Sequence, residues 1–104
     1  MNSLFINGTW KAGGGKAFQS IDPATGDVVW EGSEALASDV NDAFFAARAA
    51  FPKWARTPLE ERISILRRYV QELDKLADVL PQTISREVGK VLWETMGELN
   101  AMKG

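Results

Sequence analysis

The stretch Leu4-Phe5-Ile6-Asn7-Gly8-Thr9-Trp10 sets the pattern for the first third of the chain. Its first three residues are aliphatic and aromatic, of the kind that favours a β-strand. Asn7-Gly8 is the dipeptide that most readily takes the positive φ angles of a tight hairpin turn. Because Thr9-Trp10 then continues as the return strand, the sequence predicts a β-hairpin.

The same pattern is repeated in the next residues. Gly13-Gly14-Gly15 is predicted to form a flexible loop, and a strand over residues 17–21 follows it. Residues 22–27, Asp-Pro-Ala-Thr-Gly-Asp, predict a second turn, and Val28-Val29-Trp30 predicts the last strand. Residues 1–35 are therefore expected to form a β-meander or a pair of hairpins.

The remaining region, residues 36–104, carries apolar side chains at helical spacing. A first helix is expected with Ser38 as its N-cap. Pro52 should end this helix near Phe51, because proline disfavours helical geometry in the residue before it. The predicted buried stripe comprises Val40, Ala43, Phe44, Ala47, Ala50 and Phe51.

A second helix has the clearest start in the chain. Thr57 is predicted as its N-cap, with Pro58 at the first helical position and Glu60 at the third, which makes a capping box. Glu60 and Glu61 are best explained by their favourable interaction with the helix dipole, rather than by acid–base chemistry. The predicted buried stripe comprises Leu59, Ile63, Leu66, Val70 and Leu73.

Two further helices complete the predicted fold. Pro81 is tolerated only in a first turn, so the third helix should start near Asp78, and Gly89 suits the left-handed residue that closes it. The apolar positions between Leu92 and Leu99 predict a fourth helix whose stripe is still uncovered at Gly104. The predicted fold class is α+β, with N-terminal β-hairpins followed by three to four amphipathic helices, in a chain that reads as unfinished.

The amino-acid composition excludes several kinds of catalytic group and of binding partner. The 104 residues include no Cys and no His, so the chain has no thiolate nucleophile, no imidazole base and no usual zinc ligands. With 12 Lys and Arg against 14 Asp and Glu, the net charge is -2, and no basic patch is evident for nucleic acid. No apolar run approaches the roughly 20 residues that span a bilayer. We expect a cytoplasmic protein with no nucleic-acid or membrane partner.

A few short motifs could carry a function, but each has a simpler explanation. Gly13-Gly14-Gly15-Lys16 resembles a phosphate loop, yet Ala17 stands where Ser or Thr should hold magnesium. No G-x-G-x-x-G sequence follows a strand, so the dinucleotide fingerprint is missing. The tryptophans are too scattered for a base-stacking platform and are expected to pack in a core or an interface: Trp10, Trp30, Trp54 and Trp93.

Taken in order, the motifs resemble the start of an aldehyde dehydrogenase. The likeness covers essentially the whole chain and rests on Phe-Ile-Asn-Gly at 5–8 with Trp10, Ile-Asp-Pro-Ala-Thr-Gly-Asp at 21–27, residues 46–54, Glu61-Arg62 and residues 86–90. One departure is Val-Gly-Lys-Val at residues 88–91, where the family usually has Thr-Gly-Lys-Pro. The turn after Gly89 is therefore expected to differ in detail.

Within this family, the chain is similar to the N-succinylglutamate 5-semialdehyde dehydrogenases of arginine catabolism, through residues 26–32, 57–62 and Trp93-Glu94. The resemblance implies a several-fold longer NAD(P)-dependent enzyme, with NAD as its cofactor, that assembles as a homo-oligomer. It also implies that the catalytic Cys, the assisting Glu, the oxyanion-stabilising Asn and the cofactor fold lie beyond Gly104. The segment should therefore hold no catalytic and no cofactor-binding residue, and its partner should be the remainder of the chain.

The resemblance implies one ligand site in this segment. Several aldehyde dehydrogenases hold Na⁺ or K⁺ between a strand end and an acidic residue, and the matching positions are Ser20, Ile21 and Glu87. A hard cation prefers oxygen ligands, and one carboxylate balances one charge. The alternative is that Glu87 pairs with a nearby Lys or Arg.

A second class of function, protein–protein interaction, also fits the sequence. A stand-alone helical interaction module of the same ancestry could use its open apolar stripes to bind a partner helix or a full-length enzyme. The reading frame beyond codon 104 distinguishes this module from the segment of a longer enzyme.

Overall fold

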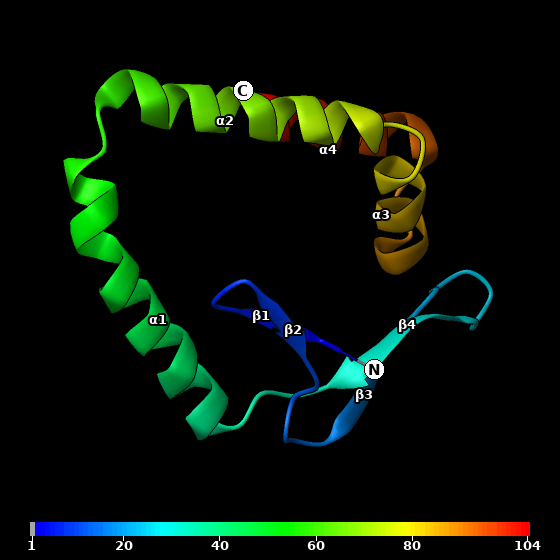
Figure 1. Cartoon of the computed structure of the whole chain (residues 1–104). Coiled ribbons are helices and arrows are strands. Elements are labelled where there is room, and N and C mark those ends of the chain that lie inside the picture. Colours follow the sequence, from blue (N-terminus) through cyan, green and yellow to red (C-terminus); the bar gives the residue numbers. More distant parts are fainter. Residues whose placement is uncertain (1) are drawn as a thin grey trace. The chain divides into compact units, whose positions relative to one another are not determined.

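The structure is a computed structural model that describes residues 2–104. The described residues form strands followed by helices, as the sequence predicts, in an α+β arrangement (Figure 1). The strands are β1 (Leu4–Ile6), β2 (Thr9–Lys11), β3 (Ala17–Ile21) and β4 (Val28–Ser33). The helices are α1 (Ala37–Arg56), α2 (Leu59–Lys75), α3 (Leu80–Val88) and α4 (Leu92–Lys103). No helix within residues 2–104 is both long and apolar enough to cross a membrane.

The strands form two separate hairpins and not a meander. In the first, β1 pairs antiparallel with β2, with Leu4 opposite Lys11 and Ile6 opposite Thr9. The turn residues Asn7 and Gly8 have φ values of 50° and 78°, as the hairpin prediction requires. In the second hairpin, β3 pairs with β4.

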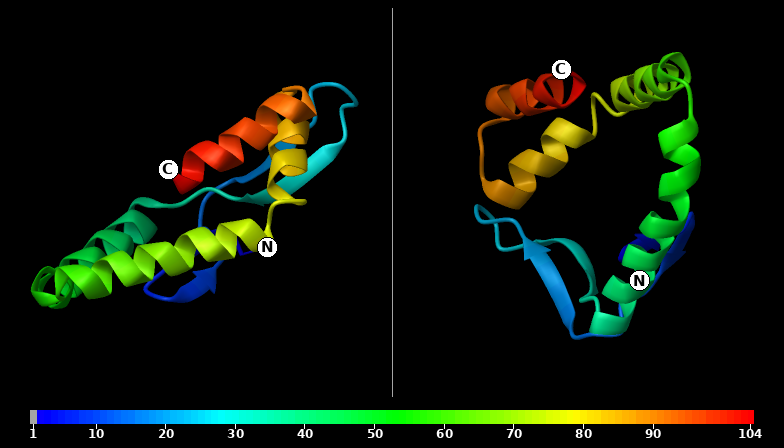
Figure 2. Two further views of the ribbon diagram at one scale, coloured as in Figure 1. Left: turned by 90° about the horizontal axis from the view of Figure 1, so that it is seen from above. Right: turned by 90° about the vertical axis from the view of Figure 1, so that its left-hand side faces the viewer.

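The contacts divide the chain into two compact units. The first unit takes the residues up to Gln19 together with Trp30–Thr57, and the second takes Ser20–Val29 together with Pro58–Gly104. Within the second unit, α4 packs against α3, which precedes it, and against α2 (Figure 2). The sequence predicts a different division, with a strand region over residues 1–35 and a helical region over residues 36–104. As a division into domains, this stays a prediction.

The predicted ends of the first helix were wrong. Ser38 is not the N-cap, because α1 already begins at Ala37 and Leu36 is the capping position. The carboxylate of Asp39 accepts the Leu36 amide at 2.9 Å, so a side chain inside the helix does the capping. Pro52 does not end the helix, which continues to Arg56. A proline this close to the C-terminus removes one backbone donor without preventing the last turn from forming.

Thr57 caps the C-terminal end of α1 and not the N-terminal end of α2. Its hydroxyl donates to the Lys53 carbonyl at 3.0 Å, and its amide donates to the Trp54 carbonyl at 3.1 Å. These bonds satisfy carbonyls at the end of α1, so the predicted Thr57 capping box is wrong, although α2 does begin at Leu59. The expectation for α3 is confirmed in its main points, with Pro81 in the first turn and Gly89 left-handed at φ 73°.

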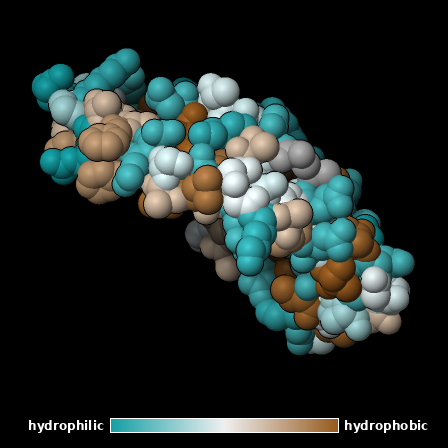
Figure 3. All heavy atoms as spheres, turned by 90° about the horizontal axis from the view of Figure 1, so that it is seen from below, coloured by the Kyte–Doolittle hydropathy of each residue, from teal (hydrophilic) through white to brown (hydrophobic). Residues whose placement is uncertain are grey.

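The described residues bury few large hydrophobic side chains. Leu73 of α2 and Leu99 of α4 are the buried ones, and both belong to the second unit, as does the fully buried Thr95. The stripes predicted as buried are otherwise mostly exposed, and Phe51 of α1 and Leu66 of α2 are 63% and 59% accessible. Figure 3 shows such hydrophobic residues at several places on one surface. A helical face is buried only where another element covers it, and residues 2–104 provide little such cover.

Candidate functional site

The carboxylate of Asp39 joins three segments of the first unit. One of its oxygens lies 2.8 Å from Nζ of Lys11 in β2. The other accepts the Leu36 amide at 2.9 Å and the Gly14 amide at 3.3 Å. Asp42, further along α1, lies 3.7 Å from the same lysine nitrogen. Asp39 therefore fastens β2 and the glycine loop to the start of α1.

These contacts stabilise the ionised form of Asp39. The hydrogen bond from Lys11 has the largest effect, followed by the amides of Leu36 and Gly14, and together they lower the pKa of Asp39 from 3.8 to about 2. The hydrogen bond to Asp39 in turn raises the pKa of Lys11. Both groups stay charged near neutral pH, so the cluster is a structural ion pair and not a proton-transfer site.

We expect Asp39→Asn to weaken the first unit at neutral pH. The folded pKa of Asp39 lies below its unfolded value, so its stabilising contribution is present above 3.8 and is lost as the pH falls to about 2. The difference in thermal midpoint between wild type and Asp39→Asn should therefore be largest near neutral pH and should vanish at the acid end. Asp42→Asn, which removes the longer contact to Lys11, is the matched control. A midpoint difference that is independent of pH would show that the ionised Asp39 is not responsible.

Hydrogen bonds join the glycine loop to three other parts of the first unit, and the flexibility expected of this loop stays a prediction. The amides of residues 13–15 donate in order to Ser3 Oγ at 3.3 Å, to Asp39 Oδ2 at 3.3 Å and to the Glu34 carbonyl at 2.8 Å. Because these donors already have protein acceptors, they are not free to surround a phosphate. The Asp39 carboxylate would also repel an anion. The residues present therefore do not fit a nucleotide phosphate.

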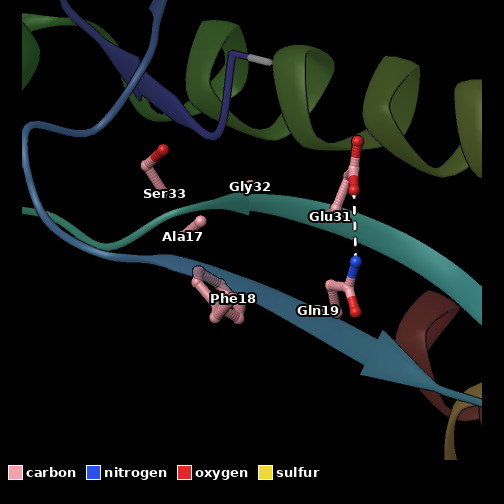
Figure 4. A pocket seen from close by; sticks show the side chains of 6 residues that line it. All are labelled: Ala17, Phe18, Gln19, Glu31, Gly32 and Ser33. Atoms are coloured by element: carbon pink, nitrogen blue, oxygen red, sulfur yellow. Dashed lines mark hydrogen bonds between the residues drawn. The ribbon is translucent and has the colours of Figure 1, made fainter.

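A pocket of about 430 Å³ lies between β3 and β4 in the first unit (Figure 4). Gln19 Nε2 donates to Glu31 Oε2 at 3.3 Å across the two strands. Glu31 is the one titratable side chain in this lining, and no base accompanies the Ser33 hydroxyl, so no nucleophile is activated here. The lining comprises Ala17, Phe18, Gln19, Glu31, Gly32 and Ser33.

The predicted cation ligands come from two segments that are neighbours in the second unit. Ile21 directly precedes Asp22, whose carboxylate lies 3.9 Å from Nε of Arg86, the residue before Glu87. The Asp22 carboxylate also accepts the Ala24 amide at 2.8 Å, which holds the turn after the strand.

A second contact joins the same two segments. A Cβ atom added to Gly89 would lie 3.0 Å from Cγ of Pro23. The turn after β3 and the end of α3 are therefore in contact on both sides of Glu87.

Glu87 itself is exposed and belongs to none of the ion pairs within residues 2–104. The ion pair at this place is made by Arg86 and Asp22. No group of three or more acidic, His or Cys side chains that could hold a metal occurs in the described part of the chain. A cation bound here would depend on one carboxylate and on main-chain carbonyls, and the site with Ser20, Ile21 and Glu87 stays a prediction.

Sequence reasoning missed the polar residues that fix this fold. Asp39 stands three residues after its capping position, which is the acidic position of a capping box, but Leu36 lacks the hydroxyl that would make the motif recognisable. Asp22 has a clearer signal, because an Asp before Pro commonly accepts the amide two residues later. The partners Lys11 and Arg86 have no local signal in the sequence.

Residues 2–104 form two β-hairpins followed by four helices, an α+β fold. The model of the aldehyde dehydrogenase family matches residues 10–103, and the chain belongs to this family. This agrees with the resemblance seen in the sequence motifs.

Individual relatives give the comparison more detail. The chain is 54% identical over 101 residues to N-succinylglutamate 5-semialdehyde dehydrogenase 2 of Caulobacter vibrioides, covering 97% of this chain and 21% of that protein. The structure of succinate-semialdehyde dehydrogenase from Burkholderia pseudomallei is similar with a TM-score of 0.89 and 32% identity, over 96% of this chain and 21% of that one. An NAD-dependent benzaldehyde dehydrogenase from Corynebacterium glutamicum matches with a TM-score of 0.87 and 28% identity, over 92% and 21% of the two chains. The chain thus spans about a fifth of the length of these relatives.

Proposed function

We propose that the chain is the N-terminal structural segment of an NAD-dependent aldehyde dehydrogenase and that the segment itself is non-catalytic. The observation that carries this proposal is the exposure of apolar side chains in a chain of this family. All four tryptophans are exposed, up to 73% for Trp93, while Leu73 and Leu99 are the large hydrophobic residues buried within residues 2–104. Such faces are typical of surfaces that further chain covers.

We infer that the full-length protein oxidises N-succinylglutamate 5-semialdehyde to N-succinylglutamate with NAD, in cytoplasmic arginine catabolism. The support is the name of the relative at 54% identity and the NAD dependence stated for a solved relative. We place the cofactor elsewhere in the full-length chain, because the amides of the glycine loop already donate to protein acceptors. By likeness to the family, we also propose that the full-length protein is a homo-oligomer.

The reading frame that contains codons 1–104 tests this proposal. The frame should continue into a Cys-containing domain, and its full product should form NADH from N-succinylglutamate 5-semialdehyde faster than from other semialdehydes. A stop codon directly after codon 104 would contradict the proposal, as would a full product that is folded but inactive on every aldehyde tested.

We further propose that Ser20 and Ile21 carbonyls and the Glu87 carboxylate bind Na⁺ or K⁺ in the full-length protein. Because a ligand that binds only the folded state stabilises it, either ion should raise the thermal midpoint at fixed ionic strength, relative to a bulky organic cation. Glu87→Gln should remove most of this increase. Glu94→Gln, a change at an exposed acidic residue of α4, is the control. If wild type and Glu87→Gln respond identically to the ions, the site does not exist.

The alternative function is the stand-alone interaction module, and it uses the same exposed apolar faces. Both functions predict that the isolated 104-residue chain is marginally stable or self-associated, because its apolar side chains are exposed to solvent. Sedimentation should therefore show association or an expanded chain. A cooperative, compact monomer would count against both functions, while the reading frame separates them.

A further inference from the structure

The apolar face of α2 contains one positively charged side chain. Arg62 follows Leu59 by three residues and precedes Leu66 by four, so the three side chains share one side of the helix. Leu59 and Leu66 are each more than half exposed. Arg62 therefore lies in a face that residues 2–104 leave largely uncovered.

The guanidinium of Arg62 has a buried donor without a partner. Its Nε atom is the one buried side-chain nitrogen or oxygen in the described chain that makes no hydrogen bond. Arg62 also belongs to none of the ion pairs formed within residues 2–104. Folded proteins rarely leave such a donor unpaired, because the lost hydration is not replaced. Residues 2–104 cover Nε itself, while the two Nη groups are not buried and make no hydrogen bond within the described residues. These Nη groups are therefore the ones that an acceptor from further chain can reach.

We propose that Arg62 anchors the α2 face to the remainder of the same polypeptide, which presents a carboxylate to the guanidinium within an apolar surface. The proposal rests on the proposed function, because it requires further chain to cover this face. Such chain is part of the proposed function, since this chain matches only 21% of the Caulobacter vibrioides relative. A carboxylate fits because it neutralises the charge and accepts two parallel N–H bonds from the planar group. A second copy docking by the same face would instead bring a second Arg62 charge into the same interface.

The test compares two substitutions in the full-length polypeptide. Arg62→Met removes the proposed anchor. Arg68→Met is the matched control, because Arg68 lies six residues further along α2, about 120° around the helix from Arg62, and its hydrogen bond is an exposed one of 3.5 Å to Ser64. Arg62→Met should lower the thermal midpoint by about 2 °C or more and should make amide exchange over α2 roughly tenfold faster. Arg68→Met should change the midpoint by less than about 1 °C.

Arg62→Lys keeps the charge but loses the planar guanidinium group. Amide exchange over α2 should therefore be faster in Arg62→Lys than in wild type and slower than in Arg62→Met. If Arg62→Met yields no soluble protein, Arg62→Lys decides the question by the same measurements. Equal effects of the Arg62 and Arg68 substitutions overturn the proposal, and so does a reading frame that closes after codon 104. NADH formation is measured on the same samples. A folded but inactive protein with an Arg62-specific loss of protection would refute the proposed function and leave the anchor supported.

Discussion

The purified 104-residue chain should form no NADH from NAD⁺ and N-succinylglutamate 5-semialdehyde at any enzyme concentration. The reason is chemical, since a chain without Cys or His has no thiolate to attack the aldehyde and no imidazole base. The glycine amides that could surround a phosphate already donate to protein acceptors. The full-length product should turn over many times per second under the same conditions, as enzymes typically do. The measurement is absorbance at the NADH band, and any turnover by the pure short chain would contradict the proposal that the segment is non-catalytic.

Gly13→Ala should strongly destabilise the first unit. A Cβ atom at Gly13 would lie 2.2 Å from the Glu34 carbonyl oxygen and 2.5 Å from that of Ser33, and both atoms belong to backbone that cannot swing away. We expect a cost of about 3 kcal/mol, at the upper end of the range for overpacking. Hydrogen exchange of the amides near the glycine loop should become roughly a hundredfold faster in the full-length polypeptide.

Gly97→Ala is the matched control with the opposite expected sign. A Cβ atom at Gly97 meets no atom within 4 Å, and the residue lies inside α4. Replacing a helical glycine with alanine should therefore stabilise α4 by about 0.5–1 kcal/mol. If Gly13→Ala leaves exchange near the glycine loop unchanged, the close approach between this loop and residues 33–34 is not present in solution.

Local signals predicted the parts of the fold that depend on few neighbouring residues. The Asn7-Gly8 turn formed as expected because positive φ angles are encoded by the dipeptide itself. Gly89 ended α3 for the same reason, and Pro81 marked the first turn of that helix. Each of these features is decided by the conformational limits of one or two residues.

Features that depend on distant residues could not be predicted in this way. The sequence of the glycine loop does not reveal that Ser3, Glu34 and Asp39 accept its amides. Thr57 looked like an N-cap, but its hydroxyl bonded backwards to Lys53 instead.

The apolar faces of the helices show that periodicity alone does not predict burial. Periodicity shows which face of a helix is apolar, but what covers that face depends on the rest of the protein. Phe51 and Leu66 lie on the predicted faces and are nevertheless exposed within the described residues. For the candidate site, the likeness to the family supplied Ser20, Ile21 and Glu87, while the nearby contact of Asp22 with Arg86 became visible only in the structure.

We propose that this chain contributes structure and no catalytic group to an aldehyde dehydrogenase. This proposal is tested most directly by replacing the corresponding segment of the Caulobacter vibrioides relative, which is 54% identical over 101 residues, with residues 1–104 of this chain. We predict a folded chimera whose kcat/KM for N-succinylglutamate 5-semialdehyde stays within about tenfold of the parent enzyme, since all catalytic and cofactor groups are retained. A folded chimera that binds NAD⁺ like the parent but has lost turnover by several orders of magnitude would contradict the proposal.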